Sequence, residues 1–373
     1  VASRGLGDVY KRQMLEKQNL LGLPRDKLKI YFSNLGEKSF RTKQIMQCIY
    51  RQDAQSFGSM HNLSKDLCKK LQAIATIDLP EVMTLNHAKD GVIKWIIKLG
   101  EENHIETVYI PERERGTLCI SSQVGCALAC TFCSTGVQGF NRNLKSHEII
   151  AQVLIAQNYL KKKDRRISNV VFMGMGEPLL NESAVYDACN LLLDDWAFGL
   201  SRRKVTVSSS GIVPAIYRMA DMIPVSLAIS LHAPNDELRN VLVPINQKYP
   251  IKELMKACKY YLNTGTQERH IFFEYVMLDG VNDLPEHAKS LARLLQGISA
   301  KVNLIPFNPF PKTQYQRSKE VTINQFQNIL YRSGIRTTTR RTRGDDVDAA
   351  CGQLAGKVLD RSRRNVGRHQ LLS

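Results

Sequence analysis

The sequence predicts an α/β fold: a partial or full (β/α) barrel with a small helical domain before it. Two observations predict it. From Thr117 onward, runs with strand character alternate six times with helical runs, the pattern of parallel strands covered by helices. The glycine-rich and polar motifs come directly after the strand runs, at the end where such barrels place their chemistry.

The six expected strands are rich in β-branched and aromatic residues. They span 117–122, 169–174, 204–209, 225–231, 271–278 and 301–307. The helices expected after them are about 147–161, 182–194, 212–221, 251–263, 285–296 and 322–332. Apolar residues recur in these segments at helical spacing, so each helix can bury one face against the sheet.

Residues 14–80 are expected to form a helical accessory domain. Pro24 suits the first turn of a helix, Gly36 suits a helix C-cap and Ser64 suits an N-cap. The faces opposite the apolar stripes carry basic residues: Arg41, Lys43, Arg51, Lys65, Lys69 and Lys70. Such a face suits nucleic acid, and an ordinary solvated helix face explains it equally well.

The remaining segments set the domain boundaries. Residues 81–112 alternate and carry Asp90-Gly91, a hairpin signal, so we expect an antiparallel β linker. The barrel domain is expected over 113–358, with a basic tail over 359–373. Residues 1–13 differ in character from the rest of the chain, so we expect a non-native leader before Met14.

Composition narrows the partners and the compartment. The formal net charge of the 373 residues is +17, which makes an anionic partner, first of all nucleic acid, the expectation. No apolar run is long enough for a membrane span, and no signal peptide is recognisable. The nine cysteines are odd in number and mostly scattered, which favours a reducing cytoplasm. Nothing suggests more than a monomer.

Three cysteines in "GCALACTFCS" are the strongest chemical signal. Cys126, Cys130 and Cys133 have the spacing C-x3-C-x2-C, and no second pair of cysteines comes after them. A structural zinc site needs four protein ligands, so zinc binding would require a distant residue to complete the site. Thiolates at this density suit a 4Fe–4S cluster with one iron left open for a small molecule.

This motif, directly after the first expected barrel strand, resembles the radical S-adenosylmethionine (SAM) superfamily. The resemblance implies a partial (β/α)6 barrel in which the amine and carboxylate of SAM bind the open iron, and SAM is cleaved to a 5′-deoxyadenosyl radical. It also implies SAM contacts at the strand ends, from "FMGMGEP" onward: Gly176, Glu177, Ser208, Ser230, Leu231, His232 and Asn308. A lone histidine such as His232 serves equally well as a structural residue.

Longer motifs, among them "TRGDDVDAACGQLAG", resemble the RlmN family of dual-specificity RNA adenine-C2 methyltransferases. The resemblance implies methylation of carbon 2 of an adenosine in 23S rRNA, and of the adenosine 3′ to the anticodon in a subset of tRNAs. Two alternatives stay open. One is the antibiotic-resistance type of rRNA methyltransferase, which acts on carbon 8. The other is a non-catalytic RNA-binding protein stapled by a metal.

Two cysteines outside the cluster have roles by the same resemblance. Cys351 lies in a polar loop of small residues, whereas Cys48, Cys68, Cys189 and Cys258 lie in helical patterns and suit buried spectators. Carbon 2 of adenine is a weak nucleophile, so a radical route is needed. The resemblance implies that Cys351 carries the methyl group as S-methylcysteine and forms a transient adduct with RNA. Cys119 then resolves the adduct through a disulfide, which an external reductant reopens.

Two further expectations concern charged residues. By resemblance Glu106 accepts a proton from the base, with Cys119 as the rival base; a carboxylate in an alternating strand is otherwise expected to face solvent. Arg340, Arg341 and Arg343 are expected to contact RNA or, alternatively, to pair with nearby acids. Those acids are Asp345, Asp346 and Asp348.

Overall fold

The computed structural model describes residues 17–113, 115–264, 270–311 and 313–354. The expected leader (1–13) and basic tail (359–373) therefore lie outside the described residues. Within the described ranges, no helix is both long and apolar enough to cross a membrane.

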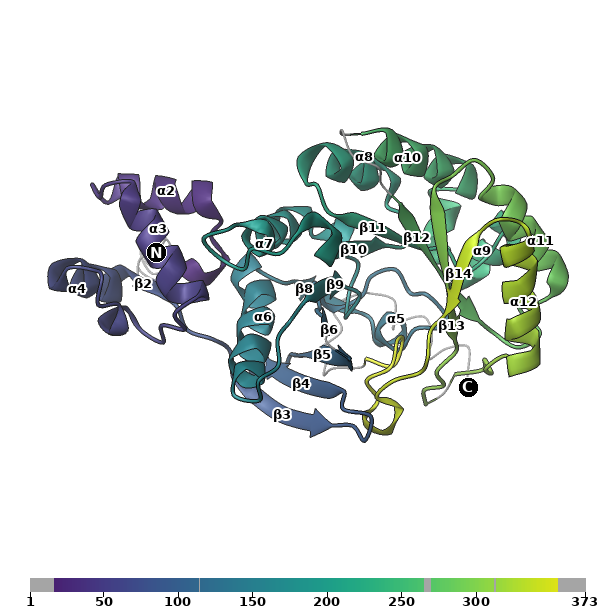
Figure 1. The fold of residues 1–373 in the computed structure, drawn as a ribbon, viewed down its shortest axis with the longest axis horizontal. Coiled ribbons are helices and arrows are strands. Elements are labelled where there is room, and N and C mark those ends of the chain that lie inside the picture. Colours follow the sequence, from purple (N-terminus) through teal and green to yellow (C-terminus); the bar gives the residue numbers. More distant parts are fainter. Residues whose placement is uncertain (1–16, 114, 265–269, 312, 355–373) are drawn as a thin grey trace, which may run out of the picture.

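A ten-stranded sheet forms the centre of the protein, in the order β14-β13-β12-β11-β10-β9-β6-β5-β4-β3 (Figure 1). Seven neighbouring strands, from β14 to β6, run parallel. They are β6 (Arg115–Cys119), β9 (Asn169–Phe172), β10 (Val205–Ser209), β11 (Ser226–Ser230), β12 (Ile271–Met277), β13 (Ala300–Pro306) and β14 (Arg336–Thr339). The first six are the predicted strands. The seventh, β14, was not predicted, because "RTTT" is short and carries no apolar run.

Six main helices cover the parallel strands, close to the predicted ranges. They are α6 (Ser146–Lys161), α7 (Glu182–Leu193), α8 (Val213–Met222), α10 (Ile251–Asn263), α11 (Pro285–Leu294) and α12 (Glu320–Arg332). Their inner faces supply much of the core: Leu254, Leu291 and Leu330 are fully buried. A short helix, α9 (Asp236–Leu242), precedes α10 and was not predicted. The sheet ends at β14 on one edge and β3 on the other, so the barrel is open, as expected of a partial barrel.

The expected linker forms β3 (Val82–His87), β4 (Ile93–Lys98) and β5 (His104–Glu112). The hairpin between β3 and β4 turns at Asp90-Gly91, where Gly91 has a φ of +87° that favours glycine. These strands do more than bridge two domains. β5 pairs with β6, so the antiparallel strands continue the barrel sheet itself, and their buried Trp95, Ile97 and Ile105 join its core.

The accessory domain consists of α2 (Arg25–Asn34), α3 (Phe40–Tyr50) and α4 (Lys65–Ile74), with β1 (Gln18–Asn19) paired to β2 (Ala75–Thr76). Ser64 caps α4 by accepting a hydrogen bond from the Leu67 amide. Several basic side chains of the accessory domain contact the barrel domain. Arg25 pairs with Asp194 and lies over the Trp196 ring, and Arg51 donates to the Asp195 and Ala197 carbonyls. Arg51, one of the residues on the expected RNA-binding face, therefore serves to dock the domain.

Candidate active site

The cysteine motif occupies a loop over the carboxyl end of the barrel. β7 (Gln123–Gly125) precedes it, α5 (Ser134–Gln138) comes after it, and β8 (Phe140–Asn143) pairs back onto β7. Residues 125 and 129 have positive φ, which turns the loop tightly and brings its cysteines together. Burial raises the pKa of Cys130 to about 12, with the neighbouring Cys133 acting in the same direction. The pKa values of Cys126 and Cys133 are likewise raised by burial and by nearby thiols.

The donor set favours a cluster over a single ion. Among the described residues, no three His, Cys, Asp or Glu side chains converge as ligands of one metal ion. A 4Fe–4S cube is wider than one ion, and its cysteine ligands bind different irons, so their sulfurs stand farther apart. Three partly buried thiols with no fourth protein ligand in the described part of the chain therefore fit a 4Fe–4S cluster better than zinc. Binding would remove the thiol protons that burial retains.

His232 supports the cysteine loop from below. Its backbone has a φ of +60°, and its Nδ1 accepts a hydrogen bond from the Val276 amide at 3.0 Å. Burial lowers its pKa to about 3, so the ring is neutral. The Phe132 ring, next to Cys133, packs edge-on against it with centroids 4.6 Å apart. The structure thus gives His232 the satisfied, structural environment that was one of its two expected roles.

The "GMGEP" turn faces the cysteine loop. Gly176 has a φ of +98°, and a Cβ there would lie 2.4 Å from the Gln123 Cβ, so only glycine fits. Glu177 is 2 % exposed and accepts hydrogen bonds from the Leu179 and Ser210 amides. Burial outweighs these bonds and raises its pKa to about 7. The negative charge of Glu177 raises the pKa of Cys126 and Cys130, which places this carboxyl group beside the thiols.

Two other predicted SAM contacts lie on adjacent strands. Ser208 on β10 and Ser230 on β11 place their hydroxyl oxygens 3.5 Å apart. Leu231 comes directly after β11 and is fully buried. Asn308, after β13, is 4 % exposed, and its amide is engaged by the protein: it donates to the Cys351 carbonyl at 3.1 Å and accepts from Thr342. Asn308 therefore ties the predicted SAM region to the loop that bears Cys351.

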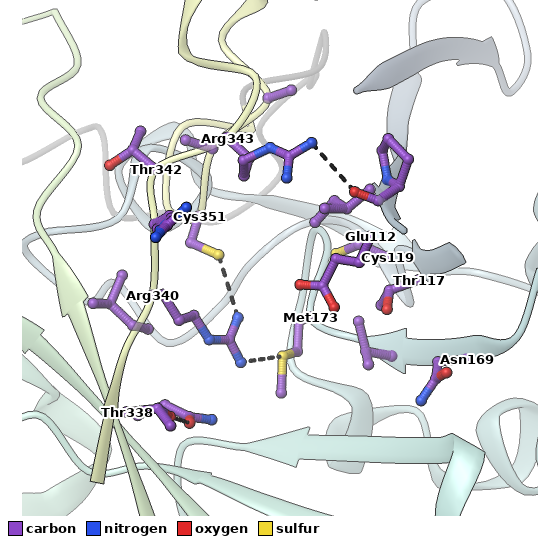
Figure 2. A pocket seen from close by; sticks show the side chains of 18 of the residues that line it. Glu112, Thr117, Cys119, Asn169, Met173, Thr338, Arg340, Thr342, Arg343 and Cys351 are labelled. Atoms are coloured by element: carbon purple, nitrogen blue, oxygen red, sulfur yellow. Dashed lines mark hydrogen bonds between the residues drawn. The ribbon is translucent and has the colours of Figure 1, made fainter. Parts of the chain in front are cut away.

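Cys119 and Cys351 line one cavity of about 1430 Å³ (Figure 2). Cys119 ends β6, whereas Cys351 is exposed on the loop after the 3-10 helix Asp345–Val347. Burial raises the pKa of Cys119 to about 12; nearby Cys351 acts in the same direction, and Arg340 opposes it. The two thiols, 232 positions apart in the chain, are thus close enough to influence each other across the cavity.

Arg340 lies between the sulfurs of this cavity and a buried acid. Its Nη1 is 3.7 Å from the Cys351 sulfur, and its Nη2 is 2.9 Å from Glu274 Oε1 and 3.8 Å from the Met173 sulfur. Arg343 instead pairs with Asp90 at 2.8 Å. The alternative expectation, that Arg340 and Arg343 pair with the acids at 345, 346 and 348, is therefore wrong: their partners are Glu274 on β12 and Asp90 in the β3–β4 turn.

The comparisons with known proteins agree with this geometry. Residues 120–295 match the radical SAM superfamily, and residues 18–77 match the ribosomal RNA large subunit methyltransferase N-terminal domain. The chain is 66% identical over 356 residues to the dual-specificity RNA methyltransferase RlmN of Vesicomyosocius okutanii, covering 95% of this chain and 100% of that protein. The chain belongs to the RlmN family of radical SAM RNA methyltransferases.

Other relatives support membership of the RlmN family. Identity to the RlmN protein of Marinobacter nauticus is 53%, over 94% of this chain and 96% of that protein. The fold is also similar to a crystal structure of a radical SAM methyltransferase from Sphaerobacter thermophilus, with a TM-score of 0.85 and 41% identity. That match covers 90% of this chain and 99% of the other.

Glu106 is buried and is not among the residues that line the cavity of this RlmN-family chain. It is 5 % exposed on β5, and its carboxylate is 3.6 Å from the Lys94 ammonium, so the expectation of a solvent-facing side chain is wrong. Val108, two residues along β5, is the register partner of Cys119, which places Glu106 on the strand face that Cys119 shares. Lys94 also donates to the Asp348 carbonyl at 3.1 Å, three residues before Cys351.

Arg239 is a site residue that sequence reasoning missed. It is fully buried and donates to the Leu231, Ser210 and Ser230 carbonyls and to the Asn246 amide oxygen. It thereby ties together the ends of β10 and β11, where the predicted SAM contacts lie. Nothing in "NDELRN" distinguishes this arginine from one on a solvated helix face, so a single sequence carries no signal for it.

Proposed function

We propose that this RlmN-family enzyme methylates carbon 2 of an adenosine in 23S rRNA and of the adenosine 3′ to the anticodon in a subset of tRNAs. Two supports combine. The curated relatives bear the name dual-specificity RNA methyltransferase. The single observation that carries the mechanism is that Cys119 and Cys351 line one cavity beside the cysteine loop, as a methyl carrier and its resolving thiol require.

In this proposal Cys126, Cys130 and Cys133 hold a 4Fe–4S cluster. SAM lies against Gly176, Glu177, Ser208, Ser230, Leu231, His232 and Asn308. When bound, the cluster and SAM supply the methyl group and a carbon-centred radical. The carboxyl group of Glu177 faces the cysteine loop and suits the amine of SAM. The paired hydroxyls of Ser208 and Ser230 suit its carboxylate or ribose.

Cys351 acts as the methyl carrier. Its sulfur takes a methyl group from one SAM and releases its proton, which gives S-methylcysteine. After a hydrogen atom is removed from that methyl group, its carbon bonds to carbon 2 of the adenine. Glu106 takes the carbon-2 proton, and a one-electron acceptor, a role that the oxidised iron–sulfur cluster would fill, takes one electron. The aromatic ring is thereby restored in a thioether adduct. The adjacent guanidinium of Arg340 stabilises negative charge on the Cys351 sulfur when its thiolate takes the methyl group.

Cys119 completes the cycle. Its thiolate attacks the Cys351 sulfur, so a sulfur–sulfur bond forms while the bond from sulfur to the methylene carbon breaks. The methylene carbon takes a proton and becomes the methyl group on carbon 2. Two electrons from an external reductant then reopen the disulfide. This chemistry suits the reducing cytoplasm, and all nine cysteines are free thiols in the structure.

Glu106 is the proton acceptor in this proposal, with Lys94 as its positioning partner. The ion pair keeps a charged carboxylate in a buried place, and the bond from Lys94 to the Asp348 carbonyl links that carboxylate to the Cys351 loop. Cys119 is less suited as the base, because its raised pKa keeps it protonated near neutral pH.

Nucleoside analysis tests the proposal. Ribosomal and transfer RNA from a strain lacking the gene should contain no 2-methyladenosine. The wild-type gene should restore it, and a gene encoding Cys351→Ala should not. Formation of 8-methyladenosine instead would assign the enzyme to the carbon-8 type. Full restoration by Cys351→Ala would exclude the carrier mechanism.

A further inference from the structure

One cavity is lined by strand β14 at the sheet edge and by the β5–β6 hairpin, which lies inside the other edge. Among the described strands β14 pairs with β13 alone, yet Thr338 and Thr339 of β14 line the same cavity as Ile110 of β5 and Thr117 of β6. We call the gap between β14 and the β5–β6 hairpin the seam. Figure 2 shows Thr338 and Cys351 on one side of the cavity and Thr117 and Cys119 on the other. A molecule entering through the seam meets Cys119 and Cys351 directly.

The cavity wall has an excess of positive charge. Six arginines line it, no lysine does, and the acids are Asp90, Glu112 and Glu274. Two of the arginines are neutralised, since Arg340 pairs with Glu274 and Arg343 pairs with Asp90. The other four are exposed, and the described residues offer their side chains no hydrogen bond or salt bridge. These are Arg113, Arg115, Arg165 and Arg341.

The four arginines lie on both edges of the seam. Arg113 and Arg115 flank the turn between β5 and β6, and Arg165 precedes β9, which pairs with β6. Arg341 comes after β14 on the opposite edge. Guanidinium groups bind phosphate through two parallel N–H donors, and arginine is the residue most used for this purpose. A row of unpaired arginines across the entrance to a cavity therefore fits a phosphodiester backbone.

We propose that the RNA backbone crosses the seam, with phosphates on either side of the target nucleotide held by Arg113, Arg115 and Arg165 on one edge and by Arg341 on the other. The target base then enters the cavity sideways toward Cys351. This inference rests on the proposed function and adds the route of the substrate. It keeps the expected RNA contact of Arg341 and adds three arginines on the opposite edge, apart from any contact that the accessory helices make. Those helices lie at the far side of the molecule from β13 and β14 (Figure 1).

Salt-dependent binding tests the seam. The probe is a synthetic anticodon stem-loop RNA with an adenosine 3′ to the anticodon, and the protein is the cluster-loaded full chain. The variant Arg113→Gln/Arg115→Gln/Arg165→Gln should lose more than about tenfold in affinity at low salt. Its slope of log affinity against log salt should shrink by about two, since each lost phosphate contact removes about 0.7–0.9.

The matched control removes the same charge elsewhere. Lys252→Gln/Lys259→Gln/Arg293→Gln takes three exposed cations from α10 and α11 on the outer layer. This variant should keep the wild-type slope. Equal loss in both triple variants would overturn the proposal, because the effect would then come from net charge alone.

RNA probes in which single phosphates are replaced by uncharged methylphosphonates show which phosphates the arginines contact. Methylphosphonates placed one at a time beside the target adenosine should weaken binding to the wild type. The triple seam variant should no longer respond at one flanking phosphate, and Arg341→Gln should no longer respond at a different one. If both variants respond to every methylphosphonate as the wild type does, the seam does not hold the backbone.

The products formed by the same variants keep this inference separate from the proposed function. Formation of 2-methyladenosine together with equal salt slopes for the seam and control variants would overturn the seam and leave the proposed function intact. A reduced slope in the seam variant together with 8-methyladenosine would support the seam and overturn the carbon-2 assignment.

Discussion

Two loops over the same end of the barrel carry the important sulfurs, and they are held in different ways. The cysteine loop (125–134) is fixed mainly through backbone contacts with its own neighbours: β7 and β8 pair around it, and the Cys126 amide donates to the Gly139 carbonyl at 2.7 Å. Leu242, Tyr315 and His232 add contacts from the barrel. The Cys351 loop (344–354) is held by side chains from distant segments. It forms hydrogen bonds with the side chains of Asp90, Lys94, Thr135 and Asn308.

The difference reflects the task of each loop. A cluster needs three thiols in one fixed arrangement, and a short local motif can provide it. In the proposed mechanism the Cys351 thiol meets a methyl donor, a base and Cys119 in turn, and contacts from several parts of the barrel suit that role. The two loops touch, since the Ser134 amide donates to the Gly352 carbonyl at 2.9 Å. Because the two loops hold different groups, substitutions in them should abolish RNA methylation with different effects on iron content.

The largest expected effects on RNA methylation are those of Cys130→Ala and Cys351→Ala, one substitution in each loop. The first should abolish RNA methylation together with iron and sulfide content, because it removes a cluster ligand. The second should abolish RNA methylation while iron and sulfide remain at the wild-type level. Anaerobic metal analysis and nucleoside mass spectrometry measure both, with the buried spectator variant Cys68→Ala as control. Loss of iron in Cys351→Ala would show that the two loops are not independent.

Cys119→Ala should stop the cycle one step later. The variant should form a covalent protein–RNA adduct and fail to release it, so a band of adduct accumulates on a denaturing gel while the wild type shows little. Normal multiple turnover by this variant would contradict the resolving role.

The pH dependence of adduct release sharpens the same point. Burial holds the pKa of Cys119 at about 12, so its thiolate fraction is small at neutral pH. As long as the pH stays below the pKa, each increase of one pH unit raises the thiolate fraction about tenfold. In rapid-quench experiments, release of methylated RNA should therefore accelerate about tenfold per unit between about pH 7 and pH 9. A flat profile would mean that Cys119 is already ionised when it attacks.

Asp90→Ala should weaken the support of the Cys351 loop. Asp90 accepts from the Arg343 guanidinium at 2.8 Å and from the Gly344 amide at 3.0 Å. Losing these bonds costs about 1–3 kcal/mol of loop positioning, so RNA methylation should fall about 10-fold to 100-fold. Iron content should not change, and Asp26→Ala on the exposed face of α2 should behave as wild type. Equal activity of the two variants would show that the hairpin does not position the loop.

The smallest expected effect is the pH dependence of SAM affinity caused by Glu177, which faces the cysteine loop. Burial raises the pKa of Glu177 to about 7, so its carboxyl group is increasingly protonated as the pH falls below that value. A protonated acid attracts the SAM amine less, and affinity should fall up to about tenfold between about pH 7 and pH 6. Equilibrium binding to the cluster-loaded protein measures this. Glu177→Gln should bind weakly at both pH values, and a pH response retained in that variant would point to another group.

The regular elements were predictable because their patterns are local. The six predicted strands and their helices are indicated by apolar runs and periodicity, and the cysteine spacing indicates the cluster chemistry. β14 escaped because four residues of "RTTT" show no period, and it becomes a strand only by pairing with β13. The partners of Arg340 and Arg343 escaped because Glu274 and Asp90 lie far away in sequence. Arg239 escaped because burial of an arginine depends on carbonyls that two other strand ends supply.

The bond between Arg343 and Asp90 joins residues that are 253 positions apart. A ribosome therefore makes the hairpin long before the arginine that docks on it, and closing so long a loop comes late in folding. The barrel core can assemble first, with its cysteine motif complete, while the carrier thiol still awaits its anchor. The order of synthesis thus makes Cys351, the methyl carrier in the proposed mechanism, the last of the proposed site residues for which an anchor becomes available.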